Sequence, residues 1–252
     1  MVQKYLDGVP ASEAVTGEEQ VITIAHTFYD QHNMLPLHTA AWANHPPGVR
    51  HVLVDDCSPT PIACHEVPSN VAIYRIDRDI PWNMAGARNL AFHVAQTDWV
   101  LSADIDHVIT AETLLQLRNL DYADDNVAHR LKRRRSDGSV GTDAIICILM
   151  NRARYIGIGG HDEDFAGSYG REETFFDQCL RYQGVTIRTC HTAFVDWHGF
   201  DGRTRGLVRC RQSNTQLFDQ KMALLRAGTY TAGARLRFPW HVVQAPEPGG
   251  GR

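Results

Sequence analysis

The sequence has no long apolar run. Nowhere in its 252 residues is there a stretch that approaches the roughly 18 uninterrupted apolar residues of a membrane-spanning helix. The first 19 residues, MVQKYLDGVPASEAVTGEE, also lack the apolar core of a signal peptide. We therefore expect a cytoplasmic protein with no transmembrane segment.

Paired cysteines and an excess of basic charge are missing as well. The six cysteines include no Cys-x-x-Cys pair, which argues against a zinc ribbon and favours small buried side chains. A formal net charge of −4 argues against a surface built throughout to hold nucleic acid. The remaining composition, 43% hydrophobic and 21% charged, is that of a globular chain long enough to bury a sizeable core.

The stretch WVLSADIDH, residues 99–107, places two acids directly after an apolar run. The run predicts a buried strand, and Asp104 and Asp106 stand at its carboxyl end. Because two neighbouring carboxylates repel each other, we expect a positive group beside them. Mg²⁺ or Mn²⁺ suits such oxygen ligands and can join them to the phosphates of a nucleotide. An acidic turn followed by a helix cap is the alternative for Asp-x-Asp alone.

Strands and helices alternate through the first half, which is typical of βαβ units. Ligands of open α/β sheets bind at the carboxyl ends of the strands, and Asp55 and Asp56 follow the second strand there. The small residues 85–87 begin a helix whose free N–H groups, together with Arg88, suit a diphosphate. The predicted strands are 21–28, 51–54, 71–76 and 99–103; the predicted helices are 34–44, one running through residues 91–95, and 110–120 with Thr110 as its cap.

The second half is less regular. Strands are predicted at 127–132 and 144–150, joined by a basic hairpin with an Asp-Gly turn, and short strands at 186–187 and 193–195. Glycines and acids crowd residues 157–173, ahead of a helix through Phe175 and Leu180. Residues 212–227 predict an amphipathic helix, and residues 245–252 a mobile Pro/Gly-rich tail.

Six short motifs, in this order, resemble a GT-A glycosyltransferase of the family 2 type over residues 21–200. The acid segment also resembles that of galactosyltransferases and polypeptide N-acetylgalactosaminyltransferases. Two departures are Cys57-Ser58, where the family commonly has Gly-Ser, and Glu172-Glu173, where it has Glu-Asp. The motifs are VDDCSP (54–59), AGARN (85–89), ADIDH (103–107), GGHDEDF (159–165), YGREE (169–173) and DWH (196–198).

The resemblance implies a single GT-A, Rossmann-like α/β domain with a mostly parallel central sheet flanked by helices. Residues 1–19 would be a flexible lead-in, 20–120 the donor-binding half, 121–230 the acceptor-binding and catalytic half, and 231–252 a tail. It implies a metal-dependent, inverting enzyme that uses a nucleotide sugar, with a UDP-sugar as the expected donor.

Each site residue then receives an implied role. His26, Asp55, Asp56, Arg88, Asp104 and Asp106 would bind the nucleotide sugar. Asp106 and Asp104 would hold Mn²⁺ or Mg²⁺, with His198 as a further ligand, although a structural role is the alternative for that histidine.

Glu173 stands at the position of the family's second acid and would be the general base, since the attacking hydroxyl must lose a proton. Glu172 would orient the acceptor. Asp162, Glu163 and Arg133 would also contact the acceptor, and the basic hairpin favours an anionic one, such as an acidic glycan, a phosphorylated molecule or DNA with hydroxymethylated bases. A solvated hairpin with no role is the alternative. A nucleotidyltransferase and a non-catalytic nucleotide-sugar binding module also remain open.

Overall fold

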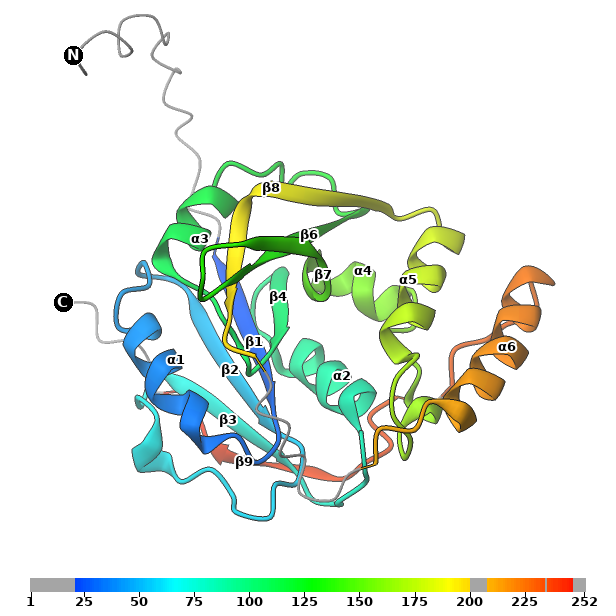
Figure 1. The fold of residues 1–252 in the computed structure, drawn as a ribbon, viewed down its shortest axis with the longest axis horizontal. Coiled ribbons are helices and arrows are strands. Elements are labelled where there is room, and N and C mark those ends of the chain that lie inside the picture. The colour runs from blue at the N-terminus through cyan, green and yellow to red at the C-terminus, as the bar shows by residue number, and fades with distance from the viewer. Residues whose placement is uncertain (1–20, 200–207, 234, 247–252) are drawn as a thin grey trace, which may run out of the picture.

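The computed structural model describes residues 21–199, 208–233 and 235–246. Within them, nine strands form one mixed sheet in the order β5-β8-β6-β7-β4-β1-β2-β3-β9 (Figure 1). The strands are β1 (Ile22–Phe28), β2 (Arg50–Asp55), β3 (Val71–Ile76), β4 (Trp99–Asp104), β5 (His107–Val108), β6 (Val127–Arg135), β7 (Val140–Asn151), β8 (Thr186–Trp197) and β9 (Trp240–Gln244).

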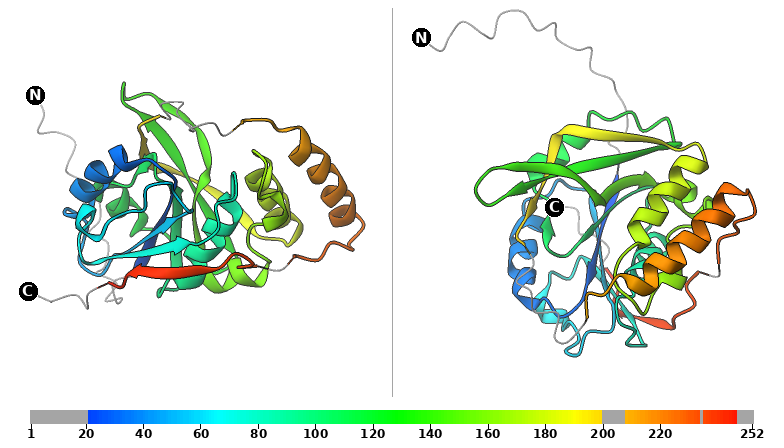
Figure 2. Two further views of the ribbon diagram at one scale, coloured as in Figure 1. Left: turned by 90° about the horizontal axis from the view of Figure 1, so that it is seen from below. Right: turned by 45° about the vertical axis from the view of Figure 1, so that its right-hand side comes forward.

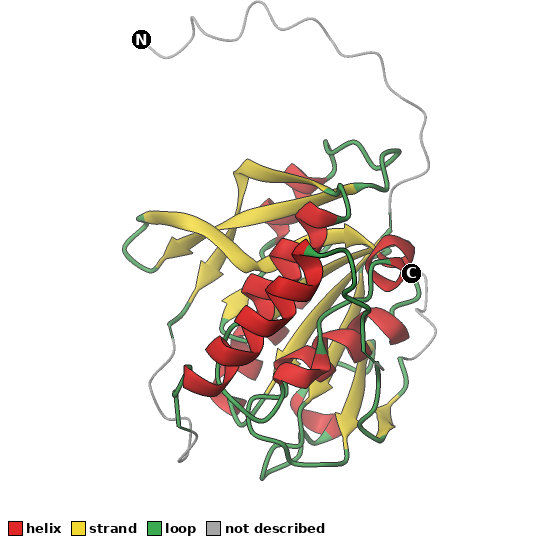
Figure 3. Cartoon of the chain, turned by 90° about the vertical axis from the view of Figure 1, so that its right-hand side faces the viewer, coloured by secondary structure: helices red, strands yellow, loops and turns green. Residues whose placement is uncertain are grey.

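Helices cover both faces of the sheet. Apolar side chains of α2, α4 and α5 pack on one face, α1 and α3 lie against the other, and α6 packs on the outside of α5 (Figures 2 and 3). The helices are α1 (Leu35–Trp42), α2 (Met84–Val94), α3 (Ala111–Leu117), α4 (Arg152–Gly157), α5 (Glu172–Tyr182) and α6 (Gln212–Arg226), with 3-10 turns at His32–Met34, Cys64–Glu66 and Glu163–Phe165. No helix among the described residues has the length and apolar content to cross a bilayer.

The parallel block β3-β2-β1-β4 confirms the predicted α/β class. These strands pair parallel in register, and their continuous apolar runs are buried on both faces. Thr110 caps α3 as predicted, since its side chain accepts a hydrogen bond from the Thr113 amide. The block therefore brings the carboxyl ends of β1, β2 and β4 to one edge of the sheet.

The second half is more continuous than the sequence indicated. β6 and β7 form one long antiparallel hairpin around the predicted Asp137-Gly138 turn. The two short strands expected at 186–187 and 193–195 are parts of the single strand β8, whose pairing with β6 shifts register between Leu131 and Lys132. The break in the apolar pattern reflects this irregularity, because three extra residues of β8 lie opposite one step of β6.

β9 is an element that the sequence did not indicate. It lies within the span assigned to a tail and pairs antiparallel with β3, so it covers an otherwise open sheet edge. The predicted lead-in, residues 1–19, and most of the predicted mobile tail, residues 247–252, lie outside the described residues. The division into donor and acceptor halves stays a prediction.

Buried histidines hold the segment that follows β4. His38 Nε2 lies 2.7 Å from the carbonyl oxygen of Ile105, His26 Nε2 3.2 Å from that of His107, and His45 Nε2 2.8 Å from that of Ile109. A carbonyl oxygen only accepts, so each Nε2 carries the proton and donates. Three imidazoles thus bind alternate carbonyls of the segment that carries Asp106.

Burial keeps these imidazoles neutral. It lowers the pKa of His38 to about 4 and that of His51, which packs between Trp42 and His45, to about 3. The unfolded chain, with histidine pKa values near 6.5, binds more protons below that pH than the folded chain does. The stability contributed by these groups is therefore fully present above about pH 6.5 and is lost as the pH falls toward about 4.

We expect the free energy of unfolding in urea to fall between pH 7.5 and about 5, at up to roughly 1.4 kcal/mol per pH unit for each such histidine. His51→Phe, which keeps a ring of similar shape, should flatten this dependence. Equal unfolding free energies at the two pH values would contradict the neutral burial of these side chains.

Candidate active site

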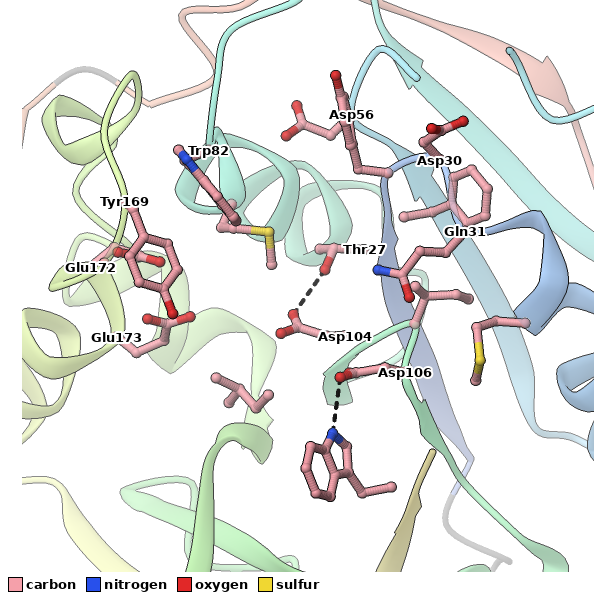
Figure 4. Close-up of a pocket in the computed structure, with 18 of the residues that line it drawn as sticks. Thr27, Asp30, Gln31, Asp56, Trp82, Asp104, Asp106, Tyr169, Glu172 and Glu173 are labelled. Carbon is pink, nitrogen blue, oxygen red and sulfur yellow. Dashed lines mark hydrogen bonds between the residues drawn. The ribbon is translucent and has the colours of Figure 1, made fainter. Parts of the chain in front are cut away.

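A cavity of about 820 Å³ opens at the sheet edge where β1 and β4 end. Thr27 at the end of β1 and Asp104 and Asp106 beside the end of β4 form its floor, as Figure 4 shows. The start of α5, with Glu172 and Glu173, forms the opposite wall. The acids that the sequence assigned to the metal and to the base therefore face one cavity.

Asp104 is held from two sides. Thr27 Oγ1 donates a hydrogen bond of 3.0 Å to Asp104 Oδ1, and Arg88 Nη2 donates one of 2.6 Å to the same oxygen. Because both bonds go to Oδ1, they fix the orientation of the carboxylate and leave Oδ2 to the cavity.

Arg88 joins Asp104 to the opposite wall. Its side chain, on α2, is 1% exposed, and its Nη1 donates a 2.7 Å hydrogen bond to Glu173 Oε1. Arg88 is not among the described residues that line the cavity, so this geometry gives no support to the expected contact with a diphosphate. A buried guanidinium must be matched by charge, and the two carboxylates provide it.

Glu172 and Glu173 differ in charge. Burial and the neighbouring Glu173 charge raise the pKa of Glu172, which keeps its proton at neutral pH. Burial also opposes ionisation of Glu173, but the charge and hydrogen bond of Arg88 outweigh it and lower the pKa of Glu173. One neutral and one ionised carboxyl group thus stand side by side at the start of α5.

Asp106 is oriented by side chains of β5 and β8. Trp197 Nε1 donates a 3.0 Å hydrogen bond to Asp106 Oδ2, and His107 Nδ1 lies 2.5 Å from Oδ1. Burial raises the pKa of Asp106, but the neighbouring His107 ring lowers it by more. The net result is a lowered pKa for Asp106. The His198 amide donates to the Asp106 carbonyl oxygen, which places the exposed His198 side chain on the same cavity.

The donor set of Asp104, Asp106 and His198 fits a divalent cation in chemistry. Asp106 Oδ1 is buried, and its 2.5 Å contact with His107 Nδ1 does not have hydrogen-bond geometry. Both carboxylates line the cavity, and carboxylate oxygens and imidazole nitrogens are ligands of such cations. Among the described residues, however, no three histidine, cysteine or acidic side chains are already gathered closely enough to hold a metal ion.

Only one acid of the Asp55-Asp56 pair faces the cavity. Asp56 lines it, accepts a 3.0 Å hydrogen bond from Asn83 Nδ2, and has its pKa raised to about 8 by burial. Asp55 instead pairs with Arg75 and accepts from the Ser58 amide at 2.8 Å. Asp56 is therefore the one placed to meet a ligand.

Besides Asp55 and Arg88, three further residues expected in the site lie away from the cavity lining. His26 is a core histidine, bound to the His107 carbonyl as described above. Asp162 accepts hydrogen bonds from Tyr230 and Lys221, and Glu163 from the amides of residues 236 and 237. Neither acid lines the cavity, and both have partners within the chain, so an acceptor contact is not supported for either.

The cavity also contains residues that the sequence analysis missed. Trp82 and Tyr169 lie with ring centroids 4.7 Å apart, and Arg209 and Arg211 lie against the Tyr169 ring. All come from loops, where no periodic pattern indicates which way a side chain points.

The arginines of the predicted basic hairpin lie in different surroundings and have different partners. Arg133 lines the cavity and donates from Nε to His107 Nε2 at 2.8 Å. Arg130 pairs with Asp177, and Arg134 pairs with Asp196 at 2.7 Å. The hairpin is therefore not one free basic surface.

Comparison with known proteins identifies the family. The sequence model described as glycosyl transferase family 2 matches residues 24–194. The chain belongs to glycosyl transferase family 2. It is a glycosyltransferase, and membership of this family sets aside the nucleotidyltransferase alternative. None of the curated protein sequences compared with it matches significantly.

Solved GT-A glycosyltransferases share the fold of this family 2 member. S. aureus TarS in complex with UDP-GlcNAc has a TM-score of 0.66 at 14% identity, over 86% of this chain and 68% of TarS. A Drosophila β-1,4-galactosyltransferase 7 mutant with manganese, UDP-Gal and xylobiose has a TM-score of 0.53 at 14% identity. The match covers 78% of this chain and 79% of the galactosyltransferase chain. GalNAc-T7 with UDP, GalNAc and Mn²⁺ has a TM-score of 0.57 at 11% identity, over 73% of this chain but 45% of its own.

Arg88→Met should destabilise the fold by about 3–5 kcal/mol, because it leaves two carboxylates in a buried site without their shared partner. Urea unfolding measures this loss. Adding Glu173→Gln to Arg88→Met should recover part of it, since one of the unpaired charges is then gone. A loss below about 1 kcal/mol, the value of an exposed ion pair, would show that Arg88 does not stabilise the site.

Proposed function

We propose that this glycosyltransferase is metal-dependent and inverting, and that it moves a sugar from a UDP-sugar to an acceptor hydroxyl. One observation carries the proposal: a single cavity gathers Asp56, the Asp104–Asp106 pair and the two α5 glutamates. The first two groups suit a nucleotide diphosphate with its cation, and the third suits proton removal.

The donor side of the cavity is the edge formed by β1, β2 and β4. Asp56, Asp30 and Gln31 lie together on this side in Figure 4. We assign the base and ribose to Asp56 and the diphosphate to the neighbourhood of Asp104 and Asp106. The related TarS and galactosyltransferase structures, which contain UDP-GlcNAc and UDP-Gal, support a UDP-sugar as the donor class.

Asp104 and Asp106, with His198, would hold a divalent cation. Manganese in the galactosyltransferase and GalNAc-T7 structures supports this choice. When bound, the cation supplies positive charge against the charge that develops on the departing nucleoside diphosphate. The chain's own contribution is to fix both carboxylates, through Thr27 and Arg88 for Asp104 and through Trp197 for Asp106.

Glu173 would be the general base. The acceptor oxygen forms a bond to the anomeric carbon as the bond from that carbon to the phosphate oxygen breaks. The acceptor's proton passes to Glu173, and the nucleoside diphosphate leaves from the opposite face, which inverts the anomeric centre. Glu173 is the ionised member of the pair, and a base must be ionised to accept a proton. The protonated Glu172 would orient the acceptor.

A panel of nucleotide sugars with Mn²⁺, scored for donor hydrolysis, tests the function. We expect turnover of a UDP-sugar that excess chelator stops, and Asp106→Asn should abolish it with the fold intact. Asp98→Asn is the matched control. Asp98 is exposed and lies just before the amino end of β4, whereas Asp106 lies just after its carboxyl end. Turnover of none of the donors would contradict the proposed function, and full turnover in excess chelator would contradict the metal dependence.

Glu173→Gln should keep donor binding and lose transfer by about two to four orders of magnitude, the range for general acid–base groups. Glu172→Gln should cost far less, because a protonated carboxyl and an amide are both neutral and similar in shape. Steady-state transfer rates and donor titrations measure the two effects. An inactive Glu172→Gln beside a near-normal Glu173→Gln would reverse the roles.

A further inference from the structure

An arginine–aromatic wall lines the cavity next to the start of α5. It consists of Trp82, Tyr169, Arg171, Arg209 and Arg211, all of which line the cavity. The Arg209 guanidinium lies 5.4 Å from the Tyr169 ring centroid and 5.8 Å from that of Trp82, and the Arg211 guanidinium lies 5.3 Å from that of Tyr169. Two ring faces and two guanidinium groups thus form one surface.

Arg171 adds a third charge, held in a strained backbone. Its φ of +82° is a left-handed conformation that residues with a Cβ rarely adopt. Its Nε donates to Thr215 Oγ1 at 3.2 Å, and its guanidinium lies 5.4 Å from the Phe218 ring centroid. α6 therefore fixes Arg171 directly before Glu172.

Two of these charges, those of Arg171 and Arg211, differ from the charges of other arginines in the chain. Arg88, Arg130 and Arg134 each form an ion pair with a carboxylate. Among the described residues, neither Arg171 nor Arg211 has a carboxylate within ion-pair distance. In a chain of net charge −4, such arginines on the wall of a cavity suit an anionic ligand from outside.

The wall stands on the acceptor side. Figure 4 shows Tyr169 beside Glu172 and Glu173, with Trp82 between Tyr169 and Asp56, and Arg171 directly precedes Glu172. We propose that the acceptor carries a phosphate near its reacting hydroxyl, bound by Arg171, Arg209 and Arg211, with a ring or base of the acceptor against Trp82 and Tyr169. Guanidinium groups match phosphate oxygens in pairs, and aromatic faces stack on bases and sugars. The proposal rests on the donor and base assignments above.

The phosphate could belong to a small molecule or to a polymer, and two probes distinguish these sources. Glycerol 3-phosphate and the oligonucleotide dT10 are titrated into the full chain saturated with UDP and Mn²⁺, which occupy the donor side. We expect at least one to bind, and Arg209→Gln/Arg211→Gln to weaken it at least tenfold. For dT10, the double variant should reduce the slope of log affinity against log salt by about 0.7 per arginine.

Arg188→Gln/Arg226→Gln is the matched control, since both side chains are exposed and lie away from the cavity lining. Its probe affinity should equal that of the unaltered chain, and Arg209→Lys/Arg211→Lys, which keeps both charges, should retain most of the binding. Tighter glycerol 3-phosphate would support a small phosphorylated acceptor, and tighter dT10 a polymeric one.

Two results would overturn the proposal. One is that neither probe binds the unaltered chain. The other is that Arg209→Gln/Arg211→Gln weakens UDP as much as the probes, which would assign these arginines to the donor diphosphate. Failure of UDP itself to bind, with probe binding intact in its absence, would count against the proposed donor and leave the phosphate site supported.

Discussion

The buried guanidinium of Arg88 is the interaction on which the site depends. A charge removed from water must be matched where it lies, and Asp104 and Glu173 match it from opposite walls of the cavity. Because Arg88, Asp104 and Glu173 belong to α2, β4 and α5, their bonds fix the distance between the end of β4 and the start of α5 across the cavity. The same pairing holds Glu173 ionised, and burial together with the charge of Glu173 keeps the proton on Glu172.

A second constraint acts on the segment between β4 and α3. Its carbonyls at 105, 107 and 109 accept hydrogen bonds from His38, His26 and His45, so α1, β1 and the residues after α1 hold its backbone. Trp197 and His107 then orient Asp106 from the other side. Each of these anchors reduces the reorganisation required when a ligand binds. The left-handed backbone at Arg171 places the opposite wall under a comparable constraint.

The sequence indicated much of this arrangement because strand patterns and strand-end acids are local signals. The apolar runs predicted β1 to β4, and parallel strands necessarily bring Asp56 and Asp104 to one edge. The internal neutralisation of Asp162 and Glu163 could not be predicted, since their partners Lys221, Tyr230 and residues 236–237 are distant in sequence. Trp82, Tyr169 and Arg211 were missed for a related reason: loop side chains carry no periodicity, and only the folded chain shows that they meet. β9 was missed because its five residues, WHVVQ, are too few to show a periodic pattern.

Titration of the α5 carboxyl groups tests the account most directly. Carbon-13 NMR of side-chain carboxyls, assigned by comparison with the Glu172→Gln and Glu173→Gln proteins, reports the charge of each group. The account predicts that at neutral pH Glu173 is ionised, with a pKa below the usual value near 4.3, while Glu172 remains protonated. Two ordinary carboxylates, both ionised at neutral pH and titrating together near 4.3, would contradict the Arg88 network and the division of roles built on it.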